Sequence, residues 1–340
     1  MTARRDPFGF TRVCYRRDTG DHATSVRALL QHHPSLSRAL DRSFLRAHLA
    51  GRTPPDQTLF EAVAELPPAH TLARHDSAPT ISPWDPTPAP GDLRALLTDA
   101  VERALASHTR CAVALSGGLD SAIVLALTGK RAPAYVLAPT MPGYSEREEA
   151  LRTARAVGAD VVVVEANEDD FRAALPEAIA AIECPLYNAH PVSKLLLARA
   201  MARDGVTLAL GGDGADHVVK RDRSADYLPL ARDLFLSAGV ALASPFLDDA
   251  VVAHLLALPA DPEKPALRAV GASLGVVREL VAGPKQGRWC PALRRDGLTS
   301  PASLARLEDA LGERLPVPDD DRAWMRQATA AMLLDSFGVG

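Results

Sequence analysis

The sequence has few cysteines, no long apolar run and no excess of basic residues. Its four cysteines stand far apart without a Cys-x-x-Cys pair, which argues against a disulfide framework or a zinc site and favours a reducing compartment. No apolar stretch approaches the ~20 residues of a membrane-spanning helix, and the N-terminus lacks the apolar segment of a signal peptide. The formal net charge of −4 argues against wholesale nucleic-acid binding. We therefore expect a soluble, cytoplasmic protein with no nucleic-acid or membrane partner.

A stretch rich in proline and small residues divides the chain. Residues 77–91 read SAPTISPWDPTPAPG, which cannot hold a helix or a central strand. We take this stretch as a linker between residues 1–76 and a larger region, residues 92–340. In the first segment, the apolar spacing predicts helices at 26–30, 43–49 and 58–66, the last stopped by Pro67 and Pro68 and followed by a strand.

Strands alternate with helices in the larger region. Apolar and β-branched runs predict strands, and the segments between them have helical spacing. The expected strands are 111–115, 135–138, 161–165 and 206–210, and the expected helices are 93–105, 121–127, 168–182 and 191–204. Ser145–Glu148 has the pattern of a capping box, and from about residue 228 the chain is predicted to be helical. The alternation predicts the α/β class, with a parallel sheet covered by helices on both faces and ligands beyond the carboxyl ends of its strands.

The most informative motif joins the first of these strands to a helix and reads Ser-Gly-Gly-Leu-Asp-Ser. Two adjacent glycines leave room for an anion against the backbone, and the following helix directs its N–H groups at that anion. Asp120 would repel a phosphate, so we expect it to act through Mg²⁺. A P-loop is excluded because no lysine follows the glycines. The candidate nucleotide-binding residues in the loop are Ser116, Gly117, Gly118, Leu119, Asp120 and Ser121.

This motif resembles the signature of the PP-loop ATP pyrophosphatases, which cleave ATP to AMP and pyrophosphate. A second loop, GGDGAD at 211–216, resembles the SG[ED]GADE loop of the asparagine synthetase family. Three later segments agree in order with that family's PFLD, K..LR and K.G…P segments: SPFLDDAVV from Ser244, EKPALRAV from Glu263 and GPKQGRWCP from Gly283. The first 76 residues resemble the last part of the family's glutaminase domain. The resemblance implies a PP-loop type of sheet, ATP and Mg²⁺.

The resemblance also suggests roles for individual residues. Asp120 and Asp216 would hold Mg²⁺ against the β- and γ-phosphates, although Asp216 could instead cap a helix. Lys285 would supply a cation to the transition state or be a solvated surface lysine. Asp213 would accept a proton from the attacking amine or only bond its own turn. Asp248 would orient the site, although an N-cap before Ala250 is the favoured reading. Adenine would lie against the first two strands through their backbones, and the remaining candidate contacts are Leu115, Val136 and Gly212.

The sequence departs from the family in informative places. Thr2 stands where the glutaminase domain has its nucleophilic cysteine, so we expect no release of ammonia from glutamine. His217 replaces a glutamate. Relatives without a working glutaminase, the β-lactam synthetases and lasso peptide cyclases, use another amine. We therefore expect an AMP-forming amide ligase in natural-product biosynthesis, acting on a small molecule or a peptide, as in lasso macrolactam formation. Two alternatives stay open: asparagine synthesis from ammonia, and a non-catalytic nucleotide-binding subunit, with a companion biosynthetic protein or a chain supplying the missing N-terminal half.

Two other features have simpler interpretations. Arg4, Arg5, Arg16 and Arg17 form a basic cluster near the N-terminus, which is most often a solvated face. His190 precedes Pro191 and is expected to be a loop residue before a helix.

Overall fold

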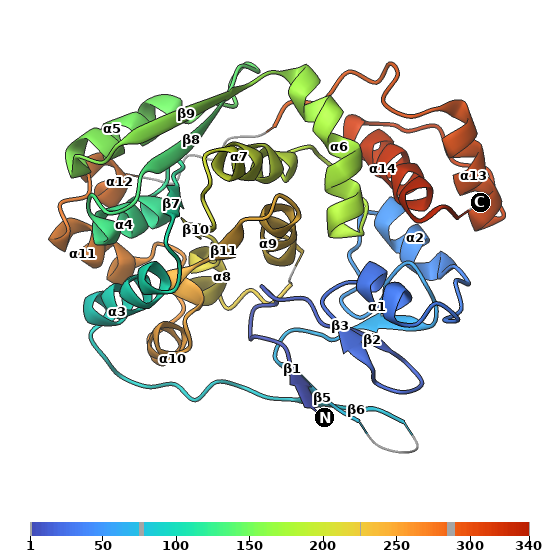
Figure 1. Cartoon of the computed structure of the whole chain (residues 1–340), viewed down its shortest axis with the longest axis horizontal. Helices are drawn as coiled ribbons and strands as arrows, with labels where there is room; N and C mark the ends of the chain where they lie inside the picture. The colour runs from blue at the N-terminus through green and yellow to red at the C-terminus, as the bar shows by residue number, and fades with distance from the viewer. Residues whose placement is uncertain (1, 75–77, 225, 284–289, 340) are drawn as a thin grey trace.

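The central sheet has the strand order β11-β10-β7-β8-β9, and all of its pairings are parallel (Figure 1). The computed structural model describes residues 2–74, 78–224, 226–283 and 290–339. The strands are β7 (Cys111–Ala114), β8 (Ala134–Pro139), β9 (Val161–Ala166), β10 (Leu208–Gly211) and β11 (Ala241–Ala243). The first four confirm predicted strands. The helical prediction from residue 228 onward is wrong at β11, because three residues are too few to show a periodicity and their pairing with β10 is not local.

Helices cover both faces of this sheet, as predicted. Val113 and Leu210 pack on one face with α3, α4, α5, α10 and α11, whereas Ala112 and Ala209 pack on the other with α7 and α9. The opposite directions of neighbouring side chains follow from the two-residue repeat of a strand. The helices are α3 (Leu93–Ala106), α4 (Leu119–Thr128), α5 (Arg147–Val157), α6 (Glu168–Ile182), α7 (Val192–Arg203), α8 (Ala215–Lys220), α9 (Leu228–Ser237), α10 (Asp249–Ala257), α11 (Pro265–Ser273) and α12 (Arg278–Ala282). None of the described helices is long and apolar enough to cross a membrane.

The N-terminal unit contains two small antiparallel sheets, with orders β1-β5-β6 and β3-β2-β4, and two short helices. Its elements are β1 (Thr2–Arg4), β2 (Cys14–Arg16), β3 (His22–Ala23), α1 (Val26–His32), α2 (Arg42–Leu49), β4 (Val63–Glu65), β5 (His70–Ala73) and β6 (Thr80–Pro83). The predicted helix at 58–66 is wrong, because pairing of β4 with β2 overrides the local helical pattern. The exposed edge strand β6 lies inside the range predicted as a linker.

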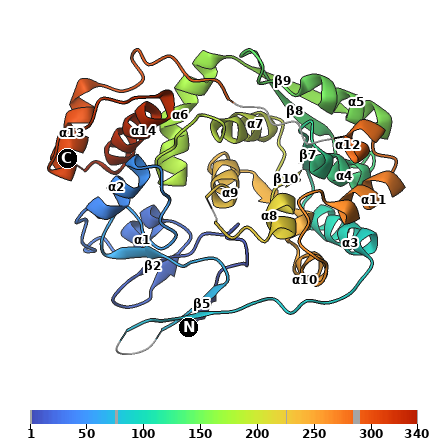
Figure 2. The same cartoon turned by 180° about the vertical axis from the view of Figure 1, so that it is seen from behind.

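The N-terminal unit and the last two helices share one hydrophobic core. These helices are α13 (Pro301–Leu311) and α14 (Asp321–Phe337). Leu29 and Phe60 lie in the same cluster as Phe171 of α6, and the ring of Phe60 meets that of Phe337 edge-on at 5.2 Å. Figures 1 and 2 show α14 between α6 and α2. The N-terminal unit is therefore packed into the larger region and not merely attached to it.

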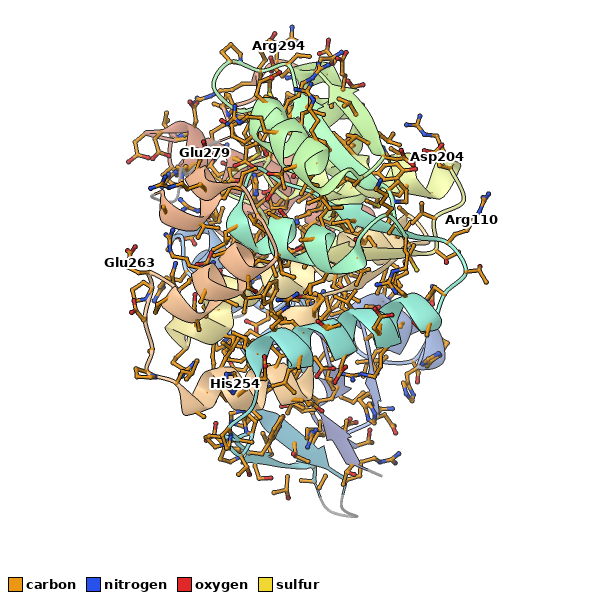
Figure 3. The ribbon with its side chains drawn as sticks, turned by 90° about the vertical axis from the view of Figure 1, so that its left-hand side faces the viewer. Arg110, Asp204, His254, Glu263, Glu279 and Arg294 are labelled. Carbon is orange, nitrogen blue, oxygen red and sulfur yellow. The ribbon has the colours of Figure 1, made fainter. Side chains whose placement is uncertain are left out.

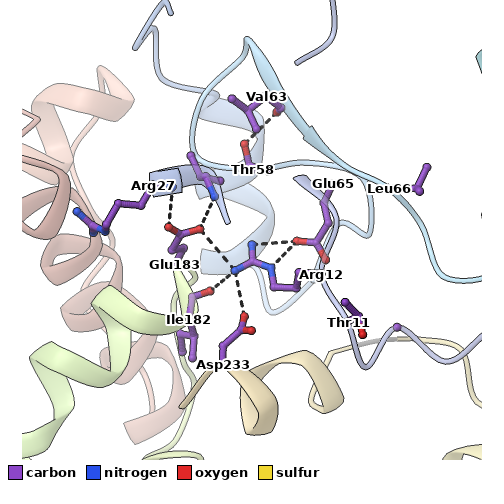
Figure 4. Close-up of polar contacts among 12 residues, drawn as sticks. Thr11, Arg12, Arg27, Thr58, Val63, Glu65, Leu66, Ile182, Glu183 and Asp233 are labelled. Atoms are coloured by element: carbon purple, nitrogen blue, oxygen red, sulfur yellow. Dashed lines mark hydrogen bonds and ion pairs between the residues drawn. The ribbon is translucent and has the colours of Figure 1, made fainter. Parts of the chain in front are cut away.

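A buried charge cluster reinforces this junction (Figure 4). Arg12 lies 2.9 Å from Glu65, 3.6 Å from Glu183 at the end of α6 and 3.6 Å from Asp233 on α9. Glu183 also accepts hydrogen bonds from the first backbone N–H groups of α1. Arg5 completes the cluster through Glu65 at 2.8 Å. The expectation of a solvated basic face is therefore wrong for Arg5, which is fully buried because Glu65 neutralises it.

The amino ends and the carboxyl ends of the central strands face opposite sides of the molecule. Arg110 precedes β7 and donates a hydrogen bond to the carbonyl of Asp204, which lies after α7 and before β10. Figure 3 shows these two residues on one side and Glu263, before α11, on the other. The motif loops follow the carboxyl ends of β7 and β10, so they lie at the edge away from Arg110.

Candidate functional site

The two motif loops touch through their backbones. β7 and β10 are neighbours in register, with Ala114 opposite Gly211, so the loops that follow them leave the sheet side by side. A Cβ atom built on Gly212 would lie 2.6 Å from the backbone nitrogen of Ser121 and 2.9 Å from the carbonyl carbon of Asp120. Only glycine permits this approach, which brings the two loops together as the sequence predicted.

The hydroxyl groups of the first loop accept hydrogen bonds from the loop's own backbone. The backbone N–H of Ser116 donates to the Ser121 hydroxyl at 3.1 Å, and that of Gly118 donates to the Ser116 hydroxyl at 3.2 Å. Gly118 is the N-cap of α4, which has no side-chain cap. The Gly117 N–H donates to the carboxylate of Glu146 at 3.0 Å. This backbone donor therefore already holds an anionic group in the structure, the carboxylate of the protein's own Glu146.

The capping box predicted over Ser145–Glu148 is absent. Glu146, and not Ser145, is the N-cap of α5, and its side chain makes no capping hydrogen bond. The Ser145 hydroxyl instead accepts a hydrogen bond from the Arg147 N–H at 3.2 Å. The side chain of Glu146 is directed to the motif loop, where it accepts the Gly117 N–H.

Asp120 and Asp216 converge on one cation. The ammonium of Lys264 lies 2.6 Å from a carboxylate oxygen of Asp120 and 3.1 Å from one of Asp216. Lys220, one turn after Asp216 on α8, lies 3.1 Å from it. We call Asp120, Asp216 and Lys264 the loop cluster. Asp216 lies inside the first turn of α8, whose N-cap is Gly214, so the helix-cap alternative does not hold.

The loop cluster fits a magnesium ion bound together with phosphates. The shared ammonium shows that the two carboxylates can approach one positive centre, and carboxylate oxygens are hard ligands of the kind that Mg²⁺ prefers. The described residues contain no group of three or more possible metal ligands. Two carboxylates with water and substrate phosphates as the remaining ligands is the usual arrangement for Mg²⁺ in nucleotide-dependent enzymes.

The segment resembling PFLD packs directly against the second loop. Pro245–Leu247 forms a 3₁₀ turn, and Leu247 occupies the space beside Gly214. A Cβ atom on Gly214 would lie 2.6 Å from Leu247, and the φ of Gly214 is +91°, so a side chain is excluded twice over. The hydroxyl of Ser244 donates to the carbonyl of Asp213. These contacts fix the path of the loop that carries Asp213 and Asp216.

Asp213 forms a close ion pair with Lys194 of α7. Its two carboxylate oxygens lie 2.8 and 3.1 Å from the ammonium. Burial, the largest cause, lowers the pKa of Lys194, but the Asp213 carboxylate, with smaller contributions from Tyr227 and Glu146, raises that pKa overall. Acceptance of a proton by Asp213 therefore requires that this pair loosen when substrates bind.

The remaining predicted site residues do not belong to the loop cluster. Asp248 accepts a hydrogen bond from the Ala250 N–H as the N-cap of α10 and pairs with Arg103 at 2.6 Å, which confirms its capping role. Leu115 and Val136 point their side chains into the core, which leaves only their backbones to a nucleotide. Lys285 lies outside the described residues.

The sequence reading assigned no role to Lys264, Lys194 or Glu146. Lys264 had a usable signal, because it is the lysine of the segment EKPALRAV. Lys194 and Glu146 had none, since each reaches the loops from a neighbouring helix through a contact that no motif marks. His190 lies before α7 as predicted and is half-buried, with its ring nitrogens near the hydroxyls of Tyr144 and Tyr227.

Comparison with known proteins agrees with the family resemblance of the two motif loops. Residues 92–235 match the asparagine synthase family model. This asparagine synthase-like region carries both glycine loops, β7 to β10 and Lys194. Putative glutamine-hydrolyzing asparagine synthetases of Mycobacterium bovis and Mycobacterium tuberculosis are 31% identical over 150 residues, which cover 41% of this chain and only 23% of those proteins.

Two solved structures are also similar. NMN synthetase from Francisella tularensis shares 16% identity at a TM-score of 0.38, covering 70% of this chain and 91% of that one. NH3-dependent NAD synthetase from Campylobacter jejuni shares 13% identity at a TM-score of 0.37, covering 67% and 97% respectively.

Proposed function

We propose that this protein is an ATP-dependent, AMP-forming amide ligase. A substrate carboxylate would attack the α-phosphorus of ATP, pyrophosphate would leave, and an amine would then displace AMP from the acyl-adenylate. The observation that carries the proposal is the convergence of Asp120 and Asp216 on one cation beside the glycine loop. The family match over residues 92–235 supports it.

Different residues of the chain would bind the phosphates and the magnesium ion. The loop from Ser116 to Ser121 would bind the phosphates through backbone N–H and hydroxyl groups. Asp120 and Asp216 would hold Mg²⁺, which would neutralise charge on the departing pyrophosphate. Lys264 now holds both carboxylates and would move from them to the same phosphates.

We propose that the amine is not ammonia released from glutamine by this chain. A glutaminase of the family needs an activated cysteine, and burial raises the pKa of all four thiols, Cys14, Cys111, Cys184 and Cys290. An amine on the substrate itself, as in formation of a peptide macrolactam, is the alternative that we favour. Asparagine formation from aspartate and free ammonia is the competing reaction, and supplying these two substrates in place of a peptide tests it directly.

The test is calorimetric titration with Mg·ATP. The parent protein should bind it, and Asp120→Asn and Asp216→Asn should each weaken binding by at least about tenfold, because each removes a ligand charge. Asp309→Asn on α13 is the matched control, since Asp309 is exposed and away from both loops. Absence of binding to the parent, or equal affinities for all variants, would reject the site.

A further inference from the structure

A pocket lies between the start of α7 and the start of α14. Its volume is about 410 Å³, within the range of small-molecule sites. Its lining comes from three stretches of chain far apart in sequence: Tyr187, Asn188, Ala189, His190, Cys290, Pro291, Ala292, Leu293, Asp321, Arg322, Trp324 and Met325. We call it the α7–α14 pocket.

The pocket adjoins the loop that carries Asp213. His190 lines it, and Lys194, one helical turn further along α7, holds Asp213. The charge of Lys194 lowers the pKa of His190 and that of Asp213 raises it, so both charged groups lie close to the His190 ring. A molecule in the pocket would therefore extend toward the second motif loop.

The inner wall is polar but uncharged. The His190 ring lies 2.7 Å from the Tyr144 hydroxyl and stacks on Tyr227 with centroids 5.9 Å apart. Burial, with Lys194 as a smaller cause, lowers the pKa of His190 to about 4, so the ring is neutral at pH 7. Both ring nitrogens face tyrosine hydroxyls, so this wall presents a neutral ring to the pocket and not a charge.

The outer walls are apolar and cationic. Leu293 and Met325 are buried, and Trp324 lies beside them in the lining. Tyr187 at the mouth is 48% exposed, and the guanidinium of Arg322 lies 5.8 Å from its ring centroid. Asp321, the acidic lining residue, is paired with Arg295 at 2.7 Å. The pocket is therefore suited to a flat apolar group with a negative or polar substituent near Arg322.

We propose that the α7–α14 pocket binds the body of the carboxylic acid that the ligase activates, and that this acid carries an aromatic or large apolar side chain. This inference rests on the proposed function. Aspartate fits poorly, because its short side chain would leave Trp324, Met325 and Leu293 without apolar contact. The pocket thus favours an aromatic amino-acid derivative or a peptide segment over the substrate of asparagine synthesis.

The experiment measures binding of N-acetyl-L-tryptophan, with L-aspartate as the comparison, by saturation-transfer NMR without nucleotide. Ala292→Trp should block the pocket, and because Ala292 is exposed the substitution should leave the fold intact. Ala305→Trp, on the exposed face of α13, is the matched control. We expect at least about a tenfold loss of N-acetyl-L-tryptophan affinity in Ala292→Trp and none in the control. Arg322→Ala should weaken binding less, with Arg314→Ala as its control.

The outcomes separate this inference from the function on which it rests. Failure of the parent to bind N-acetyl-L-tryptophan, equal binding by both tryptophan variants, or tighter binding of L-aspartate overturns the pocket assignment. Mg·ATP binding is measured on the same samples. If the parent binds N-acetyl-L-tryptophan, the Ala292→Trp variant loses that binding and the parent does not bind Mg·ATP, the ligase proposal fails while the acid-binding pocket stands.

Discussion

The buried charge cluster and the loop cluster both hold carboxylates against cations, but they differ in their access to solvent. In the buried charge cluster, the side chains of Arg12 and Glu183 are 6% and 2% exposed. In the loop cluster, those of Asp120 and Asp216 are 19% and 23% exposed, while that of Lys264, which lies between them, is 9% exposed. A closed cluster can only hold elements together, whereas an open one at the end of two strands can exchange its cation for a ligand. Substitutions should therefore reduce stability in the first cluster and activity in the second.

The largest effect should come from Arg12→Met. Arg12 compensates Glu65, Glu183 and Asp233 together, and removal of one partner from a buried ion pair costs about 3–5 kcal/mol. Denaturant unfolding should show this loss in the free energy of unfolding. Arg314→Met is the control, because its side chain is 93% exposed and its pair with Glu308 should contribute less than about 1 kcal/mol. Similar losses in both variants would mean that the buried cluster does not stabilise the junction.

The next effect concerns Lys285, which the sequence alone singles out. If it stabilises charge that develops in the transition state, Lys285→Ala should lower the rate of amide formation by about 10²–10³. Binding of Mg·ATP should stay near that of the parent protein, because the ground state does not need this cation. Product formation and pyrophosphate release should be measured side by side. Turnover at the parent rate would show that the match at GPKQG reflects only loop composition.

Lys264→Met sharpens the comparison within the loop cluster. The variant leaves Asp120 and Asp216 without their shared ammonium, but both carboxylates are partly exposed, so the free energy of unfolding should fall by less than it does in Arg12→Met. Pyrophosphate release should fall by about 10²-fold, because a positioned cation is lost from the phosphates. Lys130→Met, on the turn after α4, is the control. A loss of stability as large as that of Arg12→Met would make Lys264 a structural residue.

The last prediction is a pH dependence of stability that comes from Asp233. Burial, opposed by Arg12 and Arg232 and assisted by Glu65 and Glu183, raises its pKa from 3.8 to about 7. A carboxyl whose native pKa is raised favours folding below its unfolded pKa and loses that contribution as the pH rises through about 7. The parent should therefore lose up to about 1.4 kcal/mol per pH unit between pH 5 and 7. Asp233→Asn should flatten this slope in unfolding measurements, and an unchanged slope would assign it to other groups.

The sequence was sufficient for features that depend on neighbours along the chain. SGGLDS and GGDGAD each contain their strand end, turn and helix start, so their positions after β7 and β10 could be predicted. Contacts across the fold could not be predicted in this way. Lys264 reaches Asp120 over 144 positions, and Arg12 reaches the carbonyl of Ile182 over 170. The helix predicted at 58–66 was wrong for the same reason, because two arginines distant in sequence hold Glu65 in a strand.

Because the N-terminal unit and α14 share one core, residues 84–91 are not what holds the two parts of the molecule together. These residues run between β6 and α3 along the bottom of Figure 1, and most of them are exposed. The two parts that they connect are held by interior-like packing and a closed set of charges, as the subunits of an obligate heterodimer are. A single cut in this tether should therefore leave the two parts associated as one complex, so the fold does not depend on the covalent connection.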